Sequence, residues 1–127
     1  MRVLIVDDSR AVRFVLSKYL RELGFDVFEA VHGKDALVRL LALGATDLAL
    51  VDWNMPEMNG LELVKAVRAN PGYDSMRIMM VTTESEIESV LAALEAGANE
   101  YVMKPFTKEA IVSKLALLGL AEAEACA

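Results

Sequence analysis

The sequence predicts an α/β fold in which helices pack on both faces of a five-stranded parallel sheet. Two observations predict it. Short, continuous apolar runs recur along the chain, and segments with one apolar helical face separate them. Continuous apolar runs are typical of strands that are buried on both faces of a sheet. Strands that alternate with helices indicate right-handed crossovers, and these produce a parallel sheet.

Five strands are expected. The three strongest candidates are the apolar runs at residues 3–6, 48–51 and 78–81. Two weaker candidates lie at residues 27–28 and 101–103. For a chain of 127 residues, the usual arrangement is the flavodoxin-like strand order 2-1-3-4-5, which leaves the second and fifth strands at the edges.

Five helices are expected between and after these strands, because apolar residues recur there at the spacing of one helix face. The expected buried stripes are, in chain order, Val12, Val15, Leu16, Tyr19, Leu20 and Leu23; Ala36, Leu37, Leu40 and Leu41; Leu63, Val64 and Val67; Ile87, Val90, Leu91 and Leu94; and Ile111, Leu115 and Leu118. Glycines at positions 24, 44 and 97 follow three of the stripes, where a left-handed residue commonly ends a helix. In the fourth stripe, one or two residues at the edge are expected to be open to a partner, and Val90 is the chosen candidate.

Length and composition limit the classes of function. One domain is expected over residues 1–120, followed by a short tail over residues 121–127. No apolar run approaches the roughly 18 residues of a membrane span. The single cysteine, Cys126, has no partner for a disulfide bond, so a cytoplasmic protein is expected. The net charge of −6 disfavours binding to nucleic acid.

Acidic residues follow two strands that should be neighbours. Asp7 and Asp8 come directly after the first strand, and Asp52 follows the third. Ligands of open α/β sheets bind at the carboxyl ends of the strands, so these three carboxylates should converge. Carboxylates that lie this close together repel each other, so a bound cation would stabilise them. Mg²⁺ prefers oxygen ligands of this kind. Asp8 and Asp52 could bind the ion directly and Asp7 through water, with a loop carbonyl after Asp52.

A simpler alternative is that Asp7 or Asp8 only caps the helix that starts near Ser9. The ends of the fourth and fifth strands favour a site instead. Thr82 offers a hydroxyl group and Lys104 a mobile positive charge at the same edge of the sheet. Phosphoryl transfer mainly requires positioning and charge neutralisation, which such groups supply.

Four motifs in this order carry a resemblance to a known family. They are Val6-Asp7-Asp8-Ser9, the run from Val51 to Gly60 (VDWNMPEMNG), Val81-Thr82-Thr83-Glu84, and the run from Tyr101 to Phe106 (YVMKPF). Together they resemble the receiver domain of two-component response regulators, over residues 2 to about 118. The string Asp-Trp-Asn-Met-Pro, with no segment left for an output domain, is most similar to the CheY-type chemotaxis regulators.

The resemblance implies a role for each site residue. Asp52 would accept a phosphoryl group from a sensor histidine kinase, with Lys104 bridging to that group. Asp8, Asp52 and the carbonyl of Asn54 would bind Mg²⁺, with Asp7 in the outer shell. Thr82 and Tyr101 would form a switch pair. The Lys104–Pro105 peptide bond is similar to one that is cis in this family.

The resemblance also implies the output of the protein. A protein target would bind the face formed by the fourth helix, the fifth strand and the fifth helix, in chemotaxis or motility control. The protein would then act as a switch that gains and loses its own phosphoryl group, without multiple turnover.

Three other functions remain to be weighed. An aspartyl-phosphate phosphatase would form the same acyl phosphate and hydrolyse it rapidly. However, Asn54 stands where one large phosphatase family has a second carboxylate, two residues after the nucleophile. A nucleotide-binding module is disfavoured because neither the P-loop nor the dinucleotide glycine motif occurs. A scaffold without phosphorylation is disfavoured because the acidic residues, Thr82 and Lys104 are all present.

Overall fold

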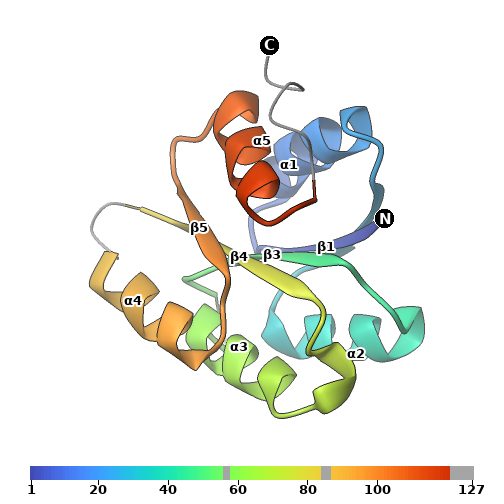
Figure 1. Cartoon of the computed structure of the whole chain (residues 1–127), viewed down its shortest axis with the longest axis vertical. Helices are drawn as coiled ribbons and strands as arrows, with labels where there is room; N and C mark the ends of the chain where they lie inside the picture. Colours follow the sequence, from blue (N-terminus) through green and yellow to red (C-terminus); the bar gives the residue numbers. More distant parts are fainter. Residues whose placement is uncertain (56–57, 84–86, 121–127) are drawn as a thin grey trace.

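Figure 1 shows the computed structural model, a central sheet with helices on both of its faces. The described residues are 1–55, 58–83 and 87–120. The expected tail at 121–127, with Cys126, therefore lies outside the described residues, as do Pro56, Glu57 and Glu84 of the motifs. Within the described ranges, no helix has the length and apolar character needed to cross a bilayer.

The strands and helices alternate as the sequence predicts. In chain order they are β1 (Arg2–Val6), α1 (Arg10–Glu22), β2 (Asp26–Ala30), α2 (Gly33–Leu43), β3 (Leu48–Asp52), α3 (Gly60–Arg68), the short 3₁₀ helix η1 (Pro71–Tyr73), β4 (Arg77–Thr82), α4 (Ile87–Ala96), β5 (Glu100–Met103) and α5 (Lys108–Leu117). All neighbouring strands pair in parallel, and the order β2-β1-β3-β4-β5 confirms the predicted topology.

The two faces of the sheet carry separate apolar layers. Alternate residues of a strand point to opposite faces, so Val3 and Ile5 pack towards α1 and α5, whereas Leu4 and Val6 pack towards α2 and α3. In Figure 1, α1 and α5 lie on one side of the sheet and α2, α3 and α4 on the other. Burial on both faces explains why β1, β3 and β4 read as unbroken apolar runs.

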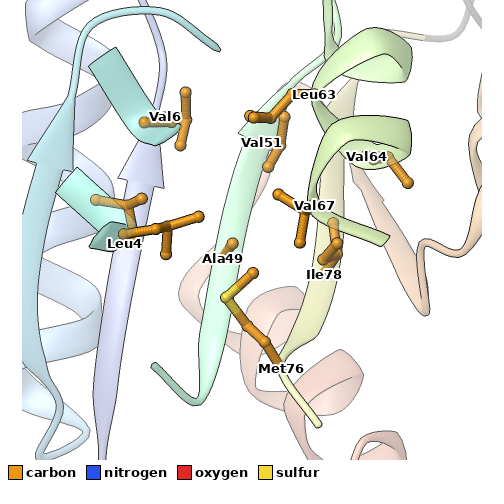
Figure 2. Close-up of a pocket in the computed structure, with 11 residues that line it drawn as sticks. Leu4, Val6, Ala49, Val51, Leu63, Val64, Val67, Met76 and Ile78 are labelled. Atoms are coloured by element: carbon orange, nitrogen blue, oxygen red, sulfur yellow. The ribbon is translucent and has the colours of Figure 1, made fainter. Parts of the chain in front are cut away.

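The layer beneath α3 contains a small cavity. Figure 2 shows side chains of β1, β3 and β4, such as Val6, Val51 and Ile78, facing Leu63 and Val67 of α3 across it. Its volume is about 10 Å³ and every lining residue is apolar. A bound water needs at least that space and two or more polar partners. We therefore regard this cavity as a packing defect of the core and not as a ligand site.

The side chain of Ile87 lies outside the described part of the structure. Among the other residues of the predicted stripes, most are buried or half-buried, with three exceptions. Val15 and Leu41, expected in the core, are exposed, Leu41 by 75%. The third exception concerns the predicted partner contact on α4. Val90 is completely buried, whereas Leu91 is 58% exposed, so the choice of Val90 as the open residue was wrong. A stripe of four apolar residues spans more of the helix circumference than the sheet and α3 cover, and only packing decides which edge is left open.

Local sequence signals set several helix ends. The glycines at 24, 44 and 97 all have positive φ angles, which confirms their predicted place after helices. Ser9 is the N-cap of α1, and its side chain accepts a hydrogen bond from the Val12 amide. His32 caps α2 in the same way, through Nδ1 and the Asp35 amide at 3.1 Å. The single histidine thus has a structural contact at a helix start.

Candidate functional site

Three carboxylates meet at the carboxyl edge of the sheet. Register pairs Val6 of β1 with Val51 of β3, so Asp7 and Asp52, which directly follow these two residues, lie beside each other at the strand ends. One oxygen each of Asp7, Asp8 and Asp52 lies within 4.8 Å of the others. The predicted convergence is therefore confirmed, although Asp8 is exposed while Asp7 and Asp52 are almost completely buried.

Lys104 reaches this cluster from the end of β5. Its Nζ lies 3.1 Å from Asp52 Oδ1 and 3.7 Å from Asp7 Oδ2. The Lys104 amide donates to the Thr82 carbonyl at 2.6 Å, so the chain continues alongside β4 beyond the regular part of β5. The Lys104–Pro105 peptide bond is cis. One ammonium group thus faces two buried carboxylates.

Asp7 is held by its neighbours in the chain and by α1. Asp7 Oδ1 accepts a hydrogen bond from the Ser9 amide at 2.8 Å, and the Asp7 carbonyl accepts one from Arg13 Nη1 at 2.7 Å. Arg13 also pairs with Glu29 of β2 at 3.1 Å. Because Ser9 itself caps α1, capping does not account for Asp7 and Asp8. Ser9, and not Asp7 or Asp8, is the N-cap of α1.

The surroundings of Asp7 and Asp52 raise the pKa of both carboxyl groups. Burial raises the pKa of Asp52 to about 6, the negative charge of Asp7 adds to this effect, and Lys104 partly offsets it. Burial also raises the pKa of Asp7, against the opposing hydrogen bond from Ser9 and the charge of Lys104. One ammonium group is therefore insufficient to compensate for this much buried negative charge.

The donor set fits a hard divalent cation. Asp7 Oδ2 is buried and accepts no hydrogen bond within the described structure, since Lys104 Nζ stays 3.7 Å away. Leaving such an atom unsatisfied costs stability. Carboxylate oxygens from three residues are the ligands that Mg²⁺ prefers, and the exposed Asp8 leaves a side open for the waters that this ion keeps.

The other predicted site residues lie around this cluster. Asn54 is exposed in the loop that follows β3. Thr82 is fully buried at the end of β4. Register pairs Tyr101 with Met80 and Met103 with Thr82, so Thr82 and Tyr101 are diagonal neighbours on one face of the sheet. Tyr101 is half-buried and packs against the core beside α4.

Trp53 and Gly60 complete the surroundings of Asp52. Trp53 is half-buried and packs against the core. Gly60 at the start of α3 donates its amide to the Trp53 carbonyl at 2.9 Å. A Cβ atom on Gly60 would lie 2.7 Å from Met80 Cε and 2.9 Å from the Asp52 carbonyl oxygen. Sequence reasoning missed this requirement, for which the glycine in the Asp52 motif was the available signal.

Comparisons with known proteins agree with this geometry. The family model described as "Response regulator receiver domain" matches residues 3–116. Chemotaxis protein CheY1 of Helicobacter pylori (strain J99) is 47% identical over 91% of this chain and 94% of its own length. The Chemotaxis protein CheY homolog of Campylobacter jejuni is 46% identical over 100% of this chain and 99% of its own.

Solved structures agree with the fold as well. The Vibrio cholerae chemotaxis protein CheY4 superimposes with a TM-score of 0.83 at 37% identity, covering 90% of this chain and 94% of that one. A response regulator from Chloroflexus aurantiacus superimposes with a TM-score of 0.86 at 33% identity, covering 92% of this chain and 95% of that one. These likenesses extend over almost all of both chains.

Proposed function

The chain belongs to the response regulator receiver domain family and is of the CheY type, and from this premise we propose that it is a chemotaxis regulator switched by phosphorylation of Asp52. The observation that carries the proposal is the contact of Lys104 Nζ with Asp52 Oδ1 at 3.1 Å, inside a cluster of three carboxylates. A buried carboxylate can act as a nucleophile. The positive charge of Lys104 beside it would compensate the negative charge of the acyl phosphate that forms.

The step proposed for Asp52 is a phosphoryl transfer. A carboxylate oxygen of Asp52 attacks the phosphorus atom of a phosphohistidine on a sensor histidine kinase. The new O–P bond forms as the P–N bond breaks, and its electron pair leaves with the imidazole of the donor. The product is an acyl phosphate on Asp52. The raised pKa of about 6 still leaves Asp52 mainly ionised at neutral pH, as this attack requires.

Chain residues supply positioning and charge for this step. Lys104 neutralises negative charge as the phosphoryl group arrives. The buried hydroxyl of Thr82, at the adjacent strand end, now donates to the Thr83 carbonyl at 3.3 Å and would instead donate to a phosphoryl oxygen. Asp7, Asp8 and Asp52, with the Asn54 carbonyl, would hold Mg²⁺, which when bound supplies further positive charge for the transferred group.

The proposed output follows from the position of Thr82 beside Tyr101. A shift of Thr82 towards a phosphoryl group would open space into which Tyr101 could turn. The face formed by α4, β5 and α5 would then change its affinity for a protein target in chemotaxis or motility control. The relatives named as chemotaxis proteins support this target class. The same resemblance supports a cytoplasmic protein that acts as a switch and not as a turnover enzyme.

The test is direct phosphorylation. Incubation with Mg²⁺ and acetyl phosphate should add one base-labile phosphoryl group per chain, measured by intact mass. Asp52→Asn should remain unlabelled, whereas Asp26→Asn, an exposed aspartate at the start of β2, should be labelled like the original protein. Equal labelling of Asp52→Asn would contradict the assignment. Release of many phosphates per chain per minute would favour the phosphatase alternative.

A further inference from the structure

Three side chains form a linked group at the outer edge of β5. Lys114 of α5 places its Nζ 3.1 Å from Glu100 Oε1 and 4.6 Å from the centre of the Tyr101 ring. The same Glu100 oxygen accepts the backbone amide of Tyr101 at 3.1 Å. All three side chains are only partly exposed, Lys114 by 28% and Glu100 by 20%. Lys114 therefore reaches from one helix layer around the edge strand to a ring that packs on the other.

The positions of these residues explain how one ammonium group contacts both partners. Glu100 pairs in register with Met79, whose side chain belongs to the layer beneath α1 and α5. Tyr101 pairs with Met80, whose side chain belongs to the opposite layer. Because β5 is the last strand of the sheet, a long side chain from α5 can pass its open edge. A cation over an aromatic ring is attracted by the negative face of the ring.

We propose that Lys114 is a positioning residue that holds Tyr101 in its present rotamer and so biases the switch. This inference rests on the proposed function, since it concerns the turning of Tyr101 that follows phosphorylation. Turning the ring away from Lys114 loses the cation–ring contact, and Glu100 keeps the ammonium group where it is. The contact therefore stabilises the arrangement in which the Tyr101 ring lies beside Lys114, and it sets how readily phosphorylation or its mimic can move that ring.

A ligand shifts a two-state equilibrium only through its differential affinity for the two states. If Lys114 contacts the Tyr101 ring in only one of the two arrangements of the switch, removing this contact changes the balance between them. The apparent affinity for beryllofluoride should then change as well. For a half-exposed cation–ring pair, we expect roughly a three- to tenfold change. Lys114→Met keeps the apolar stem but removes the charge, so its affinity for beryllofluoride, with Mg²⁺ present, should differ from that of the original protein by this factor. Lys114→Arg keeps a cation over the ring and should restore the original affinity.

Two further variants separate positioning from a general effect on stability. Lys108→Met removes another α5 ammonium group, which pairs with Glu22 of α1 at 3.8 Å, and should leave the affinity unchanged. In a Tyr101→Ala background, Lys114→Met should have no effect, because the ring on which Lys114 acts is absent. Tyr101→Phe keeps the ring and should keep the response to Lys114→Met.

The measurements are calorimetric titration with beryllofluoride and ¹⁹F spectra of protein labelled with fluorotyrosine. The Tyr101 signal, assigned with Tyr101→Phe, should shift in Lys114→Met before any mimic is added. An unchanged affinity and spectrum in Lys114→Met, while the original protein binds the mimic, would overturn the positioning role but not the proposed function. Failure of the original protein to bind the mimic would instead contradict the proposed function.

Discussion

Lys104 Nζ lies 3.1 Å from Asp52 Oδ1, which joins the carboxyl ends of β5 and β3 across the intervening strand β4. Lys104 is close enough to Asp52 for a charge-assisted hydrogen bond but too far from Asp7, at 3.7 Å, for a second one. The ammonium group thus stabilises one carboxylate more than the other. The remaining negative charge makes this edge of the sheet a source of instability when no cation is bound.

The first prediction concerns pH and Asp52. Its pKa in the folded protein is about 6, above the ordinary value of 3.8, so the folded state binds its proton more tightly than the unfolded state. This contribution to stability is fully present below about pH 4 and is lost as pH rises to about 6. Asp52→Asn keeps an oxygen acceptor for Lys104 without the charge.

The stabilising effect of Asp52→Asn should therefore grow between pH 4.5 and pH 7.5 in the absence of Mg²⁺. The gain over this pH range should be up to about 2 kcal/mol, because about a third of the full effect of the pKa shift has already developed at pH 4.5. Urea denaturation of both proteins at each pH measures it. The difference between the free energies of unfolding of the two proteins cancels the contributions of the titrating groups that both proteins share. A difference that does not depend on pH would contradict the raised pKa of Asp52.

The second prediction concerns the binding of Mg²⁺. Trp53 directly follows Asp52 and is the only tryptophan, so its fluorescence should change when the cation binds beside it. Asp8→Asn removes one of three converging carboxylates. It should therefore lower the affinity for Mg²⁺, measured by this fluorescence change, at least tenfold. Asp26→Asn, the exposed control at the start of β2, should titrate like the original protein. A normal titration by Asp8→Asn would remove Asp8 from the ligand set.

The third prediction concerns Gly60. A methyl group at this position would press on the Asp52 carbonyl and on Met80, so the loop between β3 and α3 must shift. Gly60→Ala should lower the free energy of unfolding by about 1–3 kcal/mol, a typical cost of overpacking. It should also slow phosphorylation of Asp52 by acetyl phosphate.

Gly72→Ala provides the matched control for that experiment. Its added Cβ would meet only the exposed Asn70 side chain, at 3.2 Å. Chemical denaturation and timed mass spectra should therefore show little change in this variant. Equal effects of the two substitutions would indicate a general cost of replacing glycine rather than a contact with Asp52.

The fourth prediction concerns the face of α4. Val90 is completely buried and Leu91 is 58% exposed, although both lie in one apolar stripe of the sequence. Val90→Ala should cost about 1–3 kcal/mol of stability because it leaves a cavity. Leu91→Ala should change stability by no more than about 0.5 kcal/mol. Thermal unfolding of both variants distinguishes the two residues, and a larger loss for Leu91→Ala would contradict the described packing of α4.

Sequence patterns determined the elements and most of the candidate site, because these depend on local rules. Apolar runs identified β1, β3 and β4, and glycines identified the helix ends. The parallel topology then requires residues that follow neighbouring strands to meet. For this reason the convergence of Asp7, Asp8 and Asp52 followed from their positions in the chain alone.

Tertiary structure decided what depends on how elements pack against each other. The exposed edge of α4 was one such feature, and the contact of Lys114 with Tyr101 across the edge of β5 was another. Arg68 is a third example. Its guanidinium group donates to the carbonyls of Gly97, Tyr73 and Met76 and to the Asn99 side chain, and so joins α3 to the chain around α4. In the sequence it is the last residue of an expected helix, and no local pattern indicates these partners.

The physical reason for this division is the range of the forces involved. Strand alternation, helix periodicity and caps are settled by neighbours within about four residues, which the sequence displays directly. The protonation of Asp52 and the partners of Lys114 and Arg68 depend on groups brought together from distant parts of the chain. Desolvation and charge interactions act through these spatial neighbours, so only the folded chain determines their strength.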